Sequence, residues 1–171
     1  CHFTQNRFKI RNASLAANQA HINYRESMSS HKLTVPQAIA GTTATPKIED
    51  EATTNHPAST RATIALIGHP YLLYDEYVNH RLIQRLEQAD NKVVTPEMLT
   101  NQELESGISR LAGEAYWTYE EEVVGAGGHY LQSSVDGVIG IIAFGCGPDS
   151  LIMDTVRRQE AKLRTSPFMS L

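Results

Sequence analysis

The stretch VIGIIAFGCGPDS at residues 138–150 decides how this chain is interpreted. Its apolar start runs into a cysteine between two glycines, the pattern of a buried strand that ends in a tight loop. Pro148 suits the first turn of a helix, and Asp149 and Ser150 would lie in or near that turn. The sequence therefore predicts Cys146 at the carboxyl end of a strand and the amino end of a helix. Ligands usually bind at that place in open α/β sheets, and a helix terminus favours a thiolate.

Length, charge and cysteine content limit the class of protein. At 171 residues the chain is long enough for one ordinary domain with some sequence to spare. A net charge of −4 gives no electrostatic reason to expect nucleic acid or an anionic membrane as a partner. The longest apolar run is far shorter than a membrane span and no leader pattern opens the sequence, so we expect a cytoplasmic location. Cys1 and Cys146 form neither a disulfide framework nor a zinc motif.

The composition predicts two parts, with a boundary near residue 60. Residues 1–60 are expected to form an N-terminal helix, with weak helical character over 11–31, and a linker. From residue 34 this segment is rich in Thr, Ala and Pro and has almost no bulky apolar side chains, so it cannot offset its ordering entropy. Residues 61–171 are expected to form an α/β domain. The start at Cys1 and the strand-like end PFMSL suggest a fragment of a larger protein.

The fold class follows from the alternation of strands and helices after residue 61. Strands are expected at 63–67, 92–95, 138–143 and 168–171, and helices at 75–88, 100–111, 117–132 and 148–163. This alternation implies parallel βαβ units, and the continuously apolar strands imply helices on both faces. We therefore predict a three-layer, Rossmann-like parallel sheet flanked by helices, with a mostly irregular N-terminal arm. Thr100 and Glu103 form a capping-box pattern.

A second strand-end loop, GHPYLLYD at residues 68–75, also carries candidate residues. Asp75 and Asn79 are four residues apart and would share a helix face, although Asp75 could simply cap the helix. His69 stands before a proline and could be a general base, a ligand or neither. The glycines at 125–128 follow no strand and lack a phosphate-loop ending, so we expect them to allow close packing of helices.

Four roles fit the Cys146 thiol: a nucleophile, a metal or cluster ligand, a redox thiol, or a small buried apolar group. A nucleophile needs a base, and His69 and His129 are available, although neither spacing nor motif requires such a pairing. A cluster ligand needs further thiolates, and the chain offers at most Cys1. No catalytic residue can be assigned from the residues alone.

These motifs also occur together in a known order: GHPY with Asp75 and Asn79, then Tyr116-Trp117, then FGCGPDS. In this combination residues 63–171 resemble the D-component-like region of 2-hydroxyacyl-CoA (2-hydroxyglutaryl-CoA) dehydratases, found in large CoA-substrate-specific enzyme activase-related proteins. The heptapeptide FGCGPDS is the most specific element of this resemblance.

The resemblance implies redox chemistry in which an ATP-driven activase reduces an iron–sulfur component, which passes the electron to an acyl-CoA thioester. It implies an iron–sulfur cluster in the full-length protein, with Cys146 as its metal ligand or a nearby thiol. Gly145 and Gly147 would let the backbone approach the cofactor closely. The remaining cofactor-binding residues that it implies are His69, Tyr71, Asp75 and Asn79.

The expected partners are other domains of the same polypeptide, an ATP-dependent activase and acyl-CoA. Because further cysteines are missing, we expect no cluster and no activity in this fragment alone. Two alternatives stay open. One is a non-catalytic Rossmann-like docking or binding module of a multidomain protein, and the other is a thiol-nucleophile hydrolase or transferase.

Overall fold

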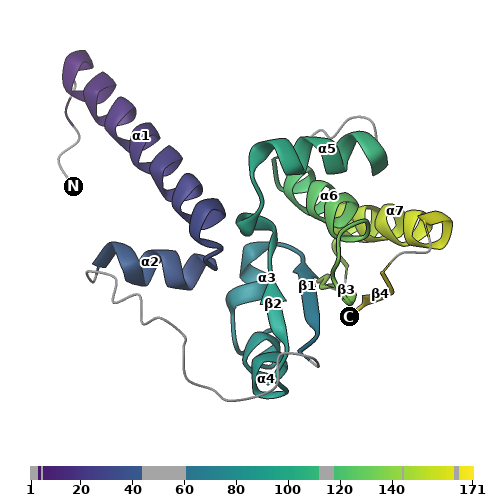
Figure 1. The fold of residues 1–171 in the computed structure, drawn as a ribbon. Coiled ribbons are helices and arrows are strands. Elements are labelled where there is room, and N and C mark those ends of the chain that lie inside the picture. The colour runs from purple at the N-terminus through teal and green to yellow at the C-terminus, as the bar shows by residue number, and fades with distance from the viewer. Residues whose placement is uncertain (1–3, 5, 44–60, 112–117, 144, 164–165) are drawn as a thin grey trace.

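A computed structural model of the chain describes residues 4, 6–43, 61–111, 118–143, 145–163 and 166–171. In this part of the chain four strands form one parallel sheet in the order β2-β1-β3-β4, with helices on both faces (Figure 1). The predicted α/β class is therefore confirmed. The elements in chain order are α1 (Arg7–His31), α2 (Val35–Thr43), β1 (Thr63–Ile67), α3 (Pro70–Tyr74), α4 (Leu82–Gln88), β2 (Lys92–Val94), the 3₁₀ helix η1 (Pro96–Met98), α5 (Asn101–Leu111), α6 (Thr118–Tyr130), β3 (Gly137–Gly140), α7 (Gly147–Leu163) and β4 (Phe168–Ser170).

The central strand β1 contributes to two hydrophobic cores. Ala65 and Ile67 are fully buried and belong to one core with Val138 of β3 and apolar residues of α5, α6 and α7. Leu66, which points to the opposite face, belongs to a second core with Leu73 of α3. Because both faces of β1 are covered, its side chains are apolar without alternation, as a strand in a three-layer fold requires.

Helices α5 and α6 pack against each other through glycines. A Cβ atom on Gly125 would lie 2.7 Å from the carbonyl oxygen of Leu104, and one on Gly107 would collide with the carbonyl oxygen of Gly125. A Cβ atom on Gly128 would likewise collide with the carbonyl oxygen of Gly107. The prediction that the glycines at 125–128 allow close helix packing is confirmed.

The predicted helix over 75–88 is wrong in its first half. Helix α3 ends at Tyr74, and the Asp75 carboxylate then accepts hydrogen bonds from the backbone N–H groups of Tyr77 and Val78, at 2.9 and 3.1 Å. Asp75 thus organises a turn, as Asp side chains often do. Arg81 is in the left-handed region at φ 57°, and α4 begins only after it. No glycine in the sequence marks this turn.

The N-terminal region is more helical than expected in its described part. Helix α1 starts at Arg7, where the Asn6 side chain accepts hydrogen bonds from two backbone N–H groups of the first turn. Helix α2 lies in the segment predicted as a linker, and residues 44–60 of that segment lie outside the described residues. The physical reason for α2 is tertiary packing, since Ala38 is only 4% exposed. None of the described helices is long and apolar enough to cross a membrane.

Candidate functional site at the carboxyl edge of the sheet

The loops after β1 and β3 meet at the point where the strand order reverses. The chain leaves β1 towards β2 on one side, while β3 lies on the other side. Ligands bind at such a switch point in open α/β sheets. The two loops start in close contact: the N–H of Ile141 donates to the carbonyl oxygen of Ile67 at 2.9 Å. A Cβ atom on Gly68 would lie 2.7 Å from the Ile141 oxygen, so only glycine fits there.

A histidine–carboxylate pair joins these two loops. The Nε2 atom of His69 lies 2.6 Å from Oδ1 of Asp149, although the two residues are 80 positions apart in the sequence. Asp149 is only 3% exposed, and its other oxygen, Oδ2, is buried without a hydrogen-bond partner. Asp149 lies in the first turn of α7, where the helix dipole stabilises negative charge. Sequence analysis placed Asp149 in this turn but missed its pairing with His69.

Cys146 lies where the sequence predicts it, after β3 and before the first residue of α7. Its carbonyl oxygen accepts hydrogen bonds from the N–H and the hydroxyl of Ser150, so Cys146 caps the helix with its backbone. The thiol is half-buried. Gly145 has φ +86°, which favours glycine, and Cβ atoms on Gly145 and Gly147 would meet nothing within 4 Å. There is therefore open space beside the cysteine loop.

Tyr71 completes the group of side chains at this edge. Its ring stacks on His69 with centroids 5.8 Å apart and planes 16° apart, and the residue is 54% exposed. Desolvation raises the pKa of the Tyr71 phenol, and the negative charges of Asp149 and Cys146 raise it further. The structure therefore brings together His69, Tyr71 and Cys146 of the predicted site residues, with Asp149 in addition.

The structure places Asp75 and Asn79 differently, in local turn contacts. The Asn79 amide donates to the carbonyl oxygen of Leu73 at 2.6 Å, and its oxygen accepts from the N–H of Leu82 at 3.3 Å. His129, the other candidate base for a nucleophile, has its pKa lowered by burial, with Glu103 acting against this shift. These contacts assign local structural roles, and a cofactor-binding role for Asp75 and Asn79 stays a prediction.

Sequence analysis missed a buried polar cluster at the end of β2. Glu97 is 3% exposed and accepts a hydrogen bond from the Tyr74 hydroxyl at 3.0 Å. That hydroxyl lies 3.2 Å from Oγ1 of Thr95, whose carbonyl oxygen accepts from the Tyr130 hydroxyl at 2.7 Å. Burial, followed by the charge of Glu97, raises the pKa of both tyrosines. The only sequence signal for this cluster was its position after a predicted strand.

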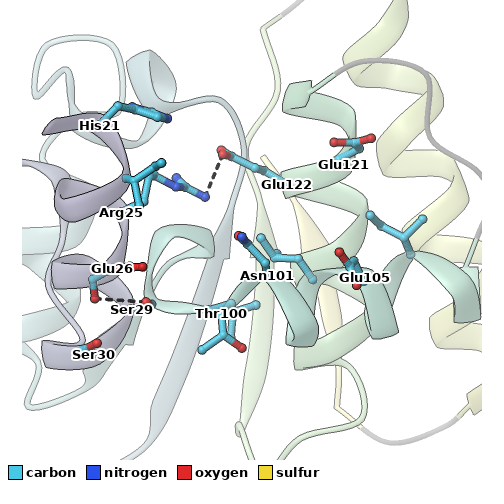
Figure 2. A pocket seen from close by; sticks show the side chains of 14 residues that line it. His21, Arg25, Glu26, Ser29, Ser30, Thr100, Asn101, Glu105, Glu121 and Glu122 are labelled. Atoms are coloured by element: carbon cyan, nitrogen blue, oxygen red, sulfur yellow. Dashed lines mark hydrogen bonds and ion pairs between the residues drawn. The ribbon is translucent and has the colours of Figure 1, made fainter. Parts of the chain in front are cut away.

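A cavity of about 720 Å³ lies between the N-terminal helix α1 and the pair α5–α6 (Figure 2). Arg25 of α1 forms an ion pair with Glu122 of α6 at 2.9 Å across it. Burial raises the pKa of Glu122, and the Arg25 guanidinium opposes that rise. The lining also includes the exposed carboxylates of Glu26, Glu105 and Glu121. Sequence analysis did not find this cavity because its two walls are far apart in the chain.

The described side chains do not fit a complete iron–sulfur cluster. Such clusters are held by several thiolates, commonly about four. The whole sequence has two cysteines, and Cys146 is the one that the structure describes. In the described ranges no group of three or more His, Cys, Asp or Glu side chains could hold a metal ion. Cys146 could supply one ligand at most, with the others from a different segment or chain.

Comparison with known families matches residues 2–99 to the CoA enzyme activase uncharacterised domain (DUF2229). The match covers more than half of the chain. The chain belongs to this family. The activase-related part of the resemblance is therefore confirmed, while the dehydratase D-component assignment stays a prediction. In this activase-related chain the matched segment includes α1, α2, β1 and β2, and the Cys146 loop lies outside it. No curated protein and no solved structure matches the chain.

Proposed function

We propose that this activase-related chain binds acyl-CoA at the point where the loops that follow β1 and β3 meet. The observation that carries the proposal is the His69–Asp149 pair, which joins these loops beside Cys146. The exposed ring of Tyr71 and the open space beside Gly145 offer contact surface for a ligand. The family description and the resemblance both name CoA chemistry, which is why an acyl-CoA is the ligand proposed.

In this proposal Cys146 is the thiol that the chain contributes to the ligand site, and His69 positions the two loops. A redox cofactor at the same place would need thiolates from outside the described residues, because Cys146 can supply one ligand at most. An iron–sulfur cluster, once complete, would supply one-electron chemistry. The residues described here would contribute one thiolate, from Cys146.

Acetyl-CoA binding to the intact protein, measured by titration calorimetry, tests the proposal. We expect one binding site per chain and at least about tenfold weaker binding in His69→Ala, since the variant loses the side-chain contact to Asp149 that joins the two loops. His31→Ala is the matched control, because this exposed histidine ends α1 and should leave the affinity unchanged. No detectable binding of acetyl-CoA to the wild-type protein would refute the proposal.

Iron and sulfide analysis of the full-length protein and of its Cys146→Ser variant tests the redox-cofactor role separately. Stoichiometric iron and sulfide that fall in Cys146→Ser would support a cluster with Cys146 as one ligand. Cys1→Ser is the control for the loss of a thiol elsewhere in the chain. A protein without iron and sulfide would remove the cluster role and leave acyl-CoA binding as the function under test.

A second candidate, a docking module, is favoured by the edge strand β4. In the described sheet β4 pairs with β3 on one side, and Met169 and Leu171 are 50% and 55% exposed. An edge strand with apolar side chains can pair with another chain. Met169→Lys should then weaken the association with a chain that pairs along β4, measured by sedimentation, while acetyl-CoA binding stays unchanged. Unchanged association in this variant would argue against docking at this edge.

A further inference from the structure

The carboxylate of Asp149 has one oxygen in use and one free. Oδ1 pairs with Nε2 of His69, while Oδ2 is buried and has no partner. Native proteins satisfy nearly all buried polar atoms, and an exception at a candidate site calls for an explanation. A carboxylate oxygen accepts hydrogen bonds. A group that meets Oδ2 must therefore bring an N–H or O–H donor.

Asp149 lies where the two loops meet, since its Oδ1 contacts His69 of the loop after β1 and Cys146 stands three residues before it. The Tyr71 ring stacks on His69, which in turn contacts Oδ1 of Asp149. Desolvation raises the pKa of the Tyr71 phenol, and the charges of Asp149 and Cys146 both raise it further. Tyr71 comes from the loop after β1 and Cys146 from the loop after β3. Oδ2 itself is buried, so a ligand has to enter between these two loops to meet it.

The same carboxylate excludes the usual ligand of such a helix terminus. The N-terminus of a helix that follows a strand commonly binds phosphate through its free N–H groups and its dipole. In α7 the first turn carries the buried carboxylate of Asp149, which would repel a phosphate. The loops at 68–75 and 145–150 contain neither Lys nor Arg, and His69 is already paired with Asp149.

We propose, on the basis of the function proposed above, that the two loops take the uncharged pantetheine arm of CoA between them and leave the nucleotide phosphates outside. An amide N–H or hydroxyl of the arm donates to Oδ2 of Asp149. The thioester end then lies near the Cys146 loop. Asp149 becomes a determinant of which half of the CoA molecule is recognised.

Three ligands titrated into the intact wild-type protein test this orientation: acetyl-CoA, acetyl-pantetheine and adenosine 3′,5′-bisphosphate. We expect acetyl-pantetheine to bind within about fivefold of the affinity of acetyl-CoA, since a fivefold change corresponds to only about 1 kcal/mol. The bisphosphate should not compete with acetyl-CoA. If the bisphosphate competes and acetyl-pantetheine does not bind, the inference is overturned while acyl-CoA binding stands. If none of the three ligands binds, the proposed function fails and the inference fails with it.

Asp149→Asn tests the residue itself. The substitution keeps the shape of the side chain but removes its charge, so acetyl-pantetheine should bind at least about tenfold more weakly. The matched control is Asp154→Asn, a carboxylate on the same helix that is half exposed and pairs with Arg158. Unchanged affinity in a folded Asp149→Asn protein, checked by circular dichroism, would overturn the inference. If that variant does not fold, the competition experiment on the wild-type protein decides the question alone.

Discussion

Replacing Gly107 with alanine should destabilise the protein because the added methyl group collides with backbone. In the wild-type protein the Gly107 position on α5 faces the carbonyl oxygen of Gly125 on α6. A side-chain neighbour could rotate away, but a helix backbone can only move as a unit. Helices α5 and α6 would therefore have to separate, and this would loosen the core residues Leu104 and Val124 on either side.

The expected loss follows from two opposing contributions. Overpacking of a dense interior costs roughly 1–3 kcal/mol, and a collision with backbone belongs at about the upper limit. Alanine in place of glycine inside a helix returns about 1 kcal/mol of helix propensity. The net expectation for Gly107→Ala is a loss of about 2 kcal/mol, or a fall in Tm of about 4–8 °C for a chain of this size.

Gly41→Ala is the matched control for this prediction. Gly41 lies in helix α2, is exposed, and a Cβ atom there would meet nothing within 4 Å. Only the propensity gain applies, so Gly41→Ala should stabilise the protein by up to about 1 kcal/mol. Differential scanning calorimetry and urea unfolding of both variants provide the comparison. Equal effects of the two substitutions would refute the backbone contact between α5 and α6.

Three further substitutions test single contacts. Thr100→Ala removes the cap of α5 and should cost about 1 kcal/mol in urea unfolding. Burial alone would raise the pKa of Glu103, but hydrogen bonds from Thr100 outweigh it and lower that pKa below 4.5. The stabilisation is therefore present above about pH 4.5 and is lost as the pH falls through the folded-state pKa of Glu103. Thr100→Ala should lose less stability on acidification than the wild-type protein, and an equal loss would contradict this account. His69→Ala leaves the buried Asp149 carboxylate without a partner and should lower the free energy of unfolding by about 2 kcal/mol, with partial recovery in His69→Gln. Equal stability of the two variants would argue against the His69–Asp149 interaction. Tyr130→Phe removes a buried hydrogen bond and should cost about 1 kcal/mol, a loss that a neutral result in thermal unfolding would disprove.

The parts of the fold that sequence analysis predicted depend on local pattern. The runs that form β1 and β3 are apolar because both faces of the sheet are covered, so these runs by themselves predict buried strands. The start of α5 follows from the capping box, in which the N–H of Thr100 donates to Glu103 at 2.7 Å. Such features can be predicted from residues that are close together in the sequence.

The parts that sequence analysis missed depend on contacts between distant segments. Helix α2 is formed by residues of weak amphipathic pattern, and the burial of Ala38 comes from packing against other elements. The break before α4 requires Arg81 at positive φ, and no residue type in that turn indicates such a conformation. Candidate site residues were found where they followed predicted strands, as with His69 and Cys146. The partner of His69 could be identified only once the strand order was known.

The pairing of β1 with β3 has a consequence for how this protein folds. The register joins Ile64 to Gly137, so the central pair of the sheet forms only after a long loop has closed. During synthesis β1 and β2 leave the ribosome well before β3, and one hydrogen-bonding edge of β1 stays open in the meantime. The family match ends at residue 99, short of β3. A polypeptide limited to residues 2–99 would keep that edge open permanently and would be prone to aggregate. The smallest independently folding unit of this sheet therefore has to extend through β3.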